Sequence, residues 1–218
     1  MKLTWLGHSS FRLEESTGTA VVTDPYHSSD VGYAMPAVAA DIVTVSHAHD
    51  DHNNVEEVSG SPKVLDSAGA YEIGGVHFLA AHTYHDGEKG ARRGDNLVFR
   101  YRMDGVDLCH MGDIGEECNA ILVDTLMPVN VLMIPVGGTY TIDAKQAKEY
   151  VDSLMPDIVI PMHYKTKDCD MDIDKVHEFL DLFEDENIVY AESATVEFDR
   201  ADFDGEETKV LVLEKLSK

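Results

Sequence analysis

Residues 46–52 read Ser-His-Ala-His-Asp-Asp-His and follow the apolar run Ile-Val-Thr-Val at 42–45. A run of β-branched residues indicates a buried strand, and polar side chains that follow it lie at the carboxyl end of that strand. His47 and His49 are two apart and would point to the same side of extended backbone, whereas Asp51 lies past the turn. Imidazoles and carboxylates suit zinc or a similar first-row ion. Because so short a segment cannot place four ligands on one ion, the stretch predicts two adjacent ions. A solvated polar turn, the alternative, does not need three imidazoles at fixed offsets.

The composition is that of an acidic globular chain. Asp and Glu number 41 against 17 Lys and Arg, which gives a formal net charge of −24 over 218 residues. So negative a surface repels nucleic acid and anionic membranes at long range, so we expect neither as a partner. The acidic residues are dispersed rather than gathered in a tail, which is also compatible with a salt-rich cytoplasm. A chain of this length is expected to form one domain, residues 1–218.

The cysteines and the N-terminus predict a cytoplasmic protein. Cys109, Cys118 and Cys169 are odd in number and show no CxxC spacing, so we expect reduced thiols rather than disulfides. Residues 1–6 enter alternating, strand-like sequence without a long apolar core or a small-residue cleavage site. We therefore expect no signal peptide and no membrane span. The oligomeric state stays open, a homo-oligomer included.

Other side chains with metal-binding chemistry also follow predicted strands. Asp24, Asp113 and His163 each come just after such a strand, and such side chains gather at one edge of an open α/β sheet. Asp24 precedes a proline, so by itself it could cap a turn or could orient a histidine ligand. The strand predicted at 75–80 leads to two histidines, His82 and His85, either of which could be the next ligand.

The motif His-x-His-x-Asp-His at 47–52 resembles the signature of the metallo-β-lactamase fold superfamily. The other candidates follow in the order of that superfamily, from Asp24 to His163. His-Asp-Gly at 85–87, followed by Arg-Gly-Asp-Asn at 93–96, resembles the branch related to ascorbate-6-phosphate lactonase. The resemblance implies an α/β fold: a four-layer αββα sandwich with helices outside two mixed sheets.

The same resemblance implies roles for individual residues. In that branch the metal-binding histidine precedes the aspartate of His-Asp-Gly, which favours His85 over His82. Asp24 and His110 would support ligands, and Asp51 would be catalytic as well as a ligand. The implied metal ligands are His47, His49 and His85 for one ion, Asp51, His52 and His163 for the other, and Asp113 between the two.

The resemblance further implies a binuclear metal-dependent hydrolase with a small-molecule substrate. A metal-bridging hydroxide would attack a lactone or other ester, an amide or a phosphodiester, because a zinc-type ion lowers the pKa of its water to about 7. The histidine-rich ligands favour two zinc ions, and the carboxylates leave manganese or iron as alternatives. The di-iron branch typically has a carboxylate where His49 stands, which argues against redox chemistry. The alternative functions are a phosphodiesterase and a metal-binding module without catalysis.

Basic residues and a glycine loop near the ligands are the candidates for substrate contact. Arg92 and Arg93 follow His85, and Lys165 follows His163, which suggests a rim for an anionic substrate. Exposed basic residues more often only solubilise a surface. The glycines of the loop at 137–141 could bring backbone amides to a ligand or could merely allow a tight turn. The predicted substrate contacts are Arg93, Gly138, Thr139, Tyr140, Tyr164 and Lys165.

Overall fold

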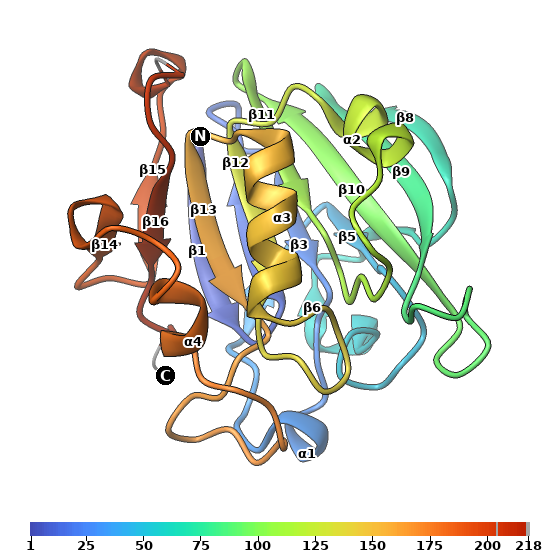
Figure 1. Cartoon of the computed structure of the whole chain (residues 1–218). Coiled ribbons are helices and arrows are strands. Elements are labelled where there is room, and N and C mark those ends of the chain that lie inside the picture. The colour runs from blue at the N-terminus through green and yellow to red at the C-terminus, as the bar shows by residue number, and fades with distance from the viewer. Residues whose placement is uncertain (204, 217–218) are drawn as a thin grey trace.

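The computed structural model describes residues 1–203 and 205–216, and its main feature is a pair of mixed β-sheets (Figure 1). In the first sheet the strand order is β15-β1-β2-β3-β5-β7, with β15 to β3 antiparallel and β3, β5 and β7 parallel. Its strands are β1 (Lys2–Gly7), β2 (Ser10–Glu14), β3 (Ala20–Thr23), β5 (Ile42–Thr44), β7 (Lys63–Leu65) and β15 (Thr195–Glu197).

The second sheet has the order β14-β16-β13-β12-β11-β10-β9-β8. Strands β8, β9, β10 and β11 form an antiparallel meander. Strands β11, β12, β13, β16 and β14, in this spatial order, run parallel to one another. Its strands are β8 (Gly69–Ile73), β9 (Val76–Tyr84), β10 (Asp95–Met103), β11 (Val106–His110), β12 (Val131–Pro135), β13 (Ile158–Met162), β14 (Ile188–Tyr190) and β16 (Lys209–Val212). A separate two-stranded ribbon pairs β4 (Val38–Ala39) with β6 (Val58–Ser59).

Alternation along the strands of the first sheet divides its side chains between two cores. Val21 and Ile42 are register partners and face the main core, which they share with residues of the second sheet. Their neighbours Val22 and Val43 are also partners and belong to a smaller core on the opposite face. This period of two is what a sheet buried on both faces requires.

Helices cover the outside of the sandwich. The helix α3 (Ala144–Leu154) contacts β12 and lies in front of the second sheet, together with α2 (Ala120–Leu126) and α4 (His177–Leu180) (Figure 1). The outer face of the first sheet is covered by α1 (Ser28–Val31) and the β4–β6 ribbon. The described part of the chain also contains three 3₁₀ helices: η1 (Val55–Glu57), η2 (Asp185–Asn187) and η3 (Arg200–Asp202). The predicted sandwich of two mixed sheets with helices outside is confirmed.

Parallel connections explain why the strands of the second sheet are so apolar. All five residues of β11 and all five of β12 are buried. Crossovers through α2 and α3 place helices on one face of these strands, and the first sheet covers the other. No helix within residues 1–203 and 205–216 is long and apolar enough to cross a membrane.

One predicted strand was too short. Its true length separates the positions of His82 and His85, the two histidines that could follow it. The strand predicted at 75–80 continues to Tyr84, because the hairpin partner β10 pairs with it along its whole length. His82 therefore lies within β9, whereas His85 comes directly after the strand end.

Candidate metal centre

The predicted ligands meet where strands of both sheets end. The 46–52 stretch follows β5, His85 follows β9, Asp113 lies beyond β11 and His163 follows β13. Strands β5, β11 and β13 are buried over most of their length, and β9 buries alternate residues, so the sheet packing holds their ends in place.

Asp113 lies at the centre of this cluster. Its Oδ2 is 3.2 Å from His163 Nε2, 3.4 Å from His85 Nε2 and 3.9 Å from His47 Nε2. Its Oδ1 is 3.2 Å from His52 Nε2. Ligand atoms about 2.1 Å from a tetrahedral ion lie roughly 3.4 Å from one another, so these separations are those of a common coordination sphere.

The side chains divide into two groups around Asp113. We call His47, His49 and His85 the first ligand group and Asp51, His52 and His163 the second ligand group. Potential ligand atoms of the first group lie within 4.8 Å of one another, as do those of the second group together with His8. His47 and His52 join the two groups through Asp113, with which they form a third such set.

Buried polar atoms without partners show that a cation fits here. His47 Nε2, His52 Nε2, His163 Nε2 and Asp113 Oδ1 are buried and accept or donate no hydrogen bond within the described residues. Each such atom costs about 1–3 kcal/mol when it is left unsatisfied. Four of them face one small volume, and imidazole nitrogen with carboxylate oxygen is the donor set of zinc and related ions.

Asp24 and Ser46 set the orientation of two of these imidazoles. Asp24 accepts hydrogen bonds from Ser46 N at 2.8 Å, Ser46 Oγ at 2.6 Å and His52 Nδ1 at 2.8 Å. Because Ser46 Oγ donates its proton to Asp24, it accepts from His47 Nδ1 at 2.9 Å. Both imidazoles thus carry a proton on Nδ1 and turn Nε2 to the centre, where a bound ion would take the place of any second proton. The sequence pattern alone does not mark Ser46 as part of this network.

Charges within the cluster shift several pKa values. Burial opposes ionisation of Asp113, but His163 and His52 outweigh it and hold the pKa of Asp113 well below its usual range. Burial also opposes a charge on His52, but Asp113 and Asp51 outweigh it and raise the pKa of His52 well above the ordinary value. Burial lowers the pKa of His47 to about 3. Bound cations would therefore meet ionised carboxylates, with one proton on His52 to displace.

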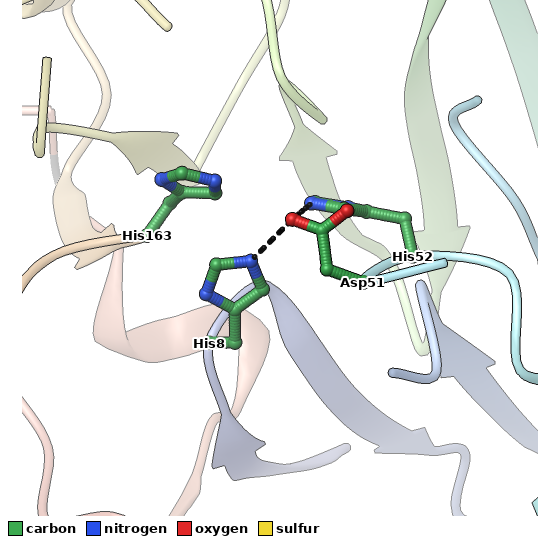
Figure 2. Close-up of side chains that lie close together, drawn as sticks. All are labelled: His8, Asp51, His52 and His163. Atoms are coloured by element: carbon green, nitrogen blue, oxygen red, sulfur yellow. Dashed lines mark hydrogen bonds and ion pairs between the residues drawn. The ribbon is translucent and has the colours of Figure 1, made fainter. Parts of the chain in front are cut away.

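His8 is a member of the cluster that the sequence did not reveal. Burial lowers its pKa to about 4, and its Nε2 lies 3.3 Å from Asp51 Oδ2. Figure 2 shows His8 facing Asp51, with His52 and His163 on either side. The bend Gly7-His8-Ser9 between β1 and β2 has no metal-ligand spacing, so no local signal marked it.

His82 and His110 take different positions from the ligands. His82 Nε2 pairs with Asp95 at 3.0 Å and its side chain is 45% exposed, outside the cluster. His110 is buried, bonds Ser9 O through Nε2 at 2.7 Å and accepts from Gly112 N through Nδ1 at 3.2 Å. His110 therefore supports the turn that carries Asp113, rather than an imidazole.

The loop after His85 is held by one carboxylate. Asp86 accepts four backbone N–H groups at 2.8–2.9 Å, from Glu88, Gly90, Arg92 and Arg93. Burial opposes the ionisation of Asp86, but these N–H groups outweigh it and lower its pKa to about 2. Asp86 thus links the position of His85 to that of Arg93.

Of the cavities beside the ligands, two are lined by both His49 and Arg93. The smaller, of about 240 Å³, is lined by His49, Asp51, His85, Arg93, Asp113, Tyr140 and Met171. The larger, of about 500 Å³, shares His49 and Arg93 with it and extends to Asn53, Asp66, His82 and Leu97. A molecule that spans both would pass His49 and the Arg93 guanidinium.

The predicted substrate contacts lie in different places. Arg93 and Tyr140 line the smaller cavity, and the guanidinium lies 4.9 Å from the Tyr140 ring and donates to Thr139 O at 3.1 Å. Thr139 thus contributes its carbonyl to Arg93. Gly138 has a φ of 58° and its carbonyl accepts Tyr140 N, so the glycine allows a tight turn.

The structure does not bring Tyr164 and Lys165 to either cavity. The Tyr164 ring is 7% exposed and packs 5.5 Å from Trp5, because it points into the core beside β13. The Lys165 ammonium donates to Met171 O, so it fixes the loop after His163. Arg92 points to solvent and pairs with Glu88 at 2.6 Å.

Comparisons with known proteins identify the family. The family described as "Beta-lactamase superfamily domain" matches residues 2–163. A protein of Methanoculleus marisnigri named "UPF0173 metal-dependent hydrolase" is 32% identical over 189 residues, covering 76% of this chain and 82% of that one. A protein of Koribacter versatilis that is also named a UPF0173 metal-dependent hydrolase is 26% identical over 200 residues, covering 76% of this chain and 85% of that one.

A solved structure is similar over nearly the whole chain. It is the crystal structure of a Thermotoga maritima protein provisionally described as a Zn-dependent hydrolase of the metallo-β-lactamase superfamily. It is 38% identical, covers 98% of both chains and superposes with a TM-score of 0.80.

Proposed function

The chain belongs to the β-lactamase superfamily and is a metal-dependent hydrolase, and from this premise we propose that it uses two divalent ions to hydrolyse a small, anionic substrate. The observation that carries the proposal is the division of the ligands into two groups around Asp113. Each group offers at least three donor atoms, and Asp113 faces both. One ion would leave one of the two groups unsatisfied.

The ligands favour zinc. Imidazoles outnumber carboxylates, and the distances around Asp113 suit four-coordinate ions. Manganese and iron are the alternatives, since Asp51 and Asp113 are hard oxygen donors. When bound, two such ions supply a hydroxide nucleophile near neutral pH and polarise the bond to be cleaved.

The residues of the chain position the reactants. Asp24 and Ser46 hold the His47 and His52 rings in the tautomer that leaves Nε2 free. Asp51 lies at the wall of the smaller cavity and is half-buried, so it reaches both the second ligand group and the substrate space. On this basis Asp51 combines ligation with the catalytic role.

The position of the Arg93 guanidinium is the reason to propose an anionic substrate. Its guanidinium is held by Thr139 O and the Tyr140 ring, and it lines both cavities. A guanidinium fixed in this way can hold a carboxylate or phosphate with two parallel hydrogen bonds. The larger cavity would take the body of the molecule, while the bond to be cleaved lies beside Asp113.

Metal analysis followed by a substrate screen tests the proposal. Elemental analysis of the purified protein should give two ions per chain, and Asp113→Ala should retain fewer than one. A panel of anionic lactones, carboxylic esters, amides and phosphodiesters, each with a neutral analogue, would then identify the bond. A single ion per chain in the active enzyme contradicts the binuclear centre. Full metal binding with no turnover of any class would instead favour a metal-binding module without catalysis.

A further inference from the structure

His8 is held rigidly against the second ligand group. Its backbone N–H donates to the Tyr33 hydroxyl at 2.8 Å, and its carbonyl accepts Trp5 Nε1 at 3.0 Å. The same carbonyl accepts the backbone N–H of His163 at 3.3 Å. The His8 φ of 51° lies in the left-handed region, which a non-glycine residue adopts at a cost when its surroundings impose it.

The preceding glycine allows this turn to fit. Gly7 has a φ of 117°, and a Cβ there would lie 2.7 Å from the Tyr33 ring and 2.9 Å from the Tyr26 hydroxyl. A side chain at this position would displace the tyrosine that holds the His8 backbone. The bend is therefore built to present His8 at one place and in one direction.

The His8 ring has two neighbours in the centre. Its centroid lies 4.2 Å from that of His163 and 5.1 Å from that of His52. Its Nε2 lies 3.3 Å from Asp51 Oδ2, in hydrogen-bonding geometry. Figure 2 shows this bond next to the contact from Asp51 to His52.

We propose that His8 is a positioning residue that donates a hydrogen bond from Nε2 to Asp51 and so orients this carboxylate toward the second ion. The inference rests on the proposed function, because it concerns one of the two ions. Within the described residues, His8 Nε2 at 3.3 Å is the nearer of two nitrogens that face Asp51 Oδ2, and His52 Nε2 lies 3.5 Å from the same oxygen. Asp24, by comparison, accepts three hydrogen bonds, and ligating carboxylates generally need such support.

A hydrogen bond explains the arrangement better than direct ligation by His8. The second ligand group and Asp113 already supply four donor atoms, which fill a tetrahedral sphere. A fifth protein donor would exceed that number, so His8 is not needed as a ligand. A hydrogen-bond donor to the carboxylate holds Asp51 without adding a further ligand.

A double-mutant cycle tests the proposal. Zinc affinity is measured by competition with a chromogenic chelator for the parent, His8→Ala, His8→Gln, Asp51→Ala and the double alanine variant. His8→Ala should weaken the affected ion about 10- to 100-fold, the usual cost of losing a support for a ligand. His8→Gln should stay within about threefold of the parent, because its amide nitrogen stands as many bonds from Cα as Nε2 does. In the Asp51→Ala background, His8→Ala should change affinity less than about threefold.

Each other outcome overturns the proposal. If the losses from His8→Ala and Asp51→Ala multiply, His8 binds the ion itself. If His8→Ala leaves affinity unchanged, or His8→Gln falls as far as His8→Ala, no hydrogen bond to Asp51 is involved. The exposed histidine variant His77→Ala is the matched control, and the melting temperature of each metal-free protein checks folding. A parent with one ion would contradict the binuclear function, while the cycle would still show whether His8 acts through Asp51 on that ion.

Discussion

The two ligand groups differ in burial, charge and support. In the second group, His52 and His163 are fully buried, and Asp51 brings a negative charge of its own. The first group consists of three imidazoles, and its His49 is exposed where both cavities meet. A buried group with a carboxylate binds a cation more tightly than an open group of neutral ligands. We therefore expect the second ion to be tightly held and the first to exchange more readily and to meet the substrate.

The largest effect is expected from His85, because it belongs to the first group alone. His85→Ala should abolish turnover and weaken the first ion by more than about 100-fold, the upper end for residues that only support a ligand. The second ion should remain, so elemental analysis should find one ion per chain. His82→Ala is the matched control from the strand that precedes His85, since His82 pairs with Asp95 outside the cluster. Equal metal content in His85→Ala and the parent would contradict the assignment.

Ser46 offers a smaller and more selective test of the same difference. Ser46→Ala removes the link from Asp24 to His47 but leaves the direct bond from Asp24 to His52. The first ion should weaken by roughly tenfold, and the second should change little. Stepwise metal titration measures both, with Ser153→Ala on the exposed face of α3 as control. An equal loss of affinity at both titration steps would show that the two ligand groups are not supported separately.

Substitution of Arg93 tests whether the substrate binds beside the first ligand group. Arg93→Ala should raise the KM for an anionic substrate by about tenfold, and that for a neutral analogue of the same bond much less. Arg92→Ala removes the same charge one residue away, where the side chain pairs with Glu88, and should leave both values near the parent's. Lys165→Ala should likewise change the KM values of the anionic substrate and its neutral analogue about equally, because the Lys165 ammonium donates to the Met171 carbonyl. If Arg93→Ala affects both substrates equally, the guanidinium is structural.

The smallest effect concerns the loop that carries Arg93. The pKa of Asp86 is lowered to about 2, below its ordinary value near 4, so the charged form stabilises the folded state above pH 4. That stabilisation is lost as the pH falls toward 2. Asp86→Asn should therefore melt a few degrees below the parent at pH 6, and the difference should narrow as the pH falls from 4. A difference that is the same at every pH would show that the charge of Asp86 is not what holds the loop.

Some of the centre could be predicted from local sequence because strand ends are local features. A β-branched run followed by polar residues predicts which side chains lie at the carboxyl end of a strand, as for His47, Asp113 and His163. The structure places His47 Nε2 3.9 Å and His163 Nε2 3.2 Å from Asp113 Oδ2. The supporting role expected for Asp24 likewise corresponds to its bonds with Ser46 and His52.

Direction and pairing across the molecule depended on the tertiary structure. Lys165 and Arg93 both follow a predicted ligand, yet Lys165 turns to Met171 and Arg93 lies over Tyr140. Sequence distance from a ligand cannot distinguish these two cases, because each side chain takes the hydrogen-bond acceptor or the ring that the packed loops place in reach.

The sequence by itself determined the fold class, through the motif that resembles the superfamily, and it indicated most of the side chains that gather at the candidate metal centre, because these follow predicted strands. The tertiary structure alone decided that His8, 43 residues from Asp51, lies 3.3 Å from its carboxylate. It also decided that Ser46 joins Asp24 to His47. Such contacts arise when separate strands pack at one sheet edge, and the orientation of a side chain there depends on neighbours that are distant in sequence.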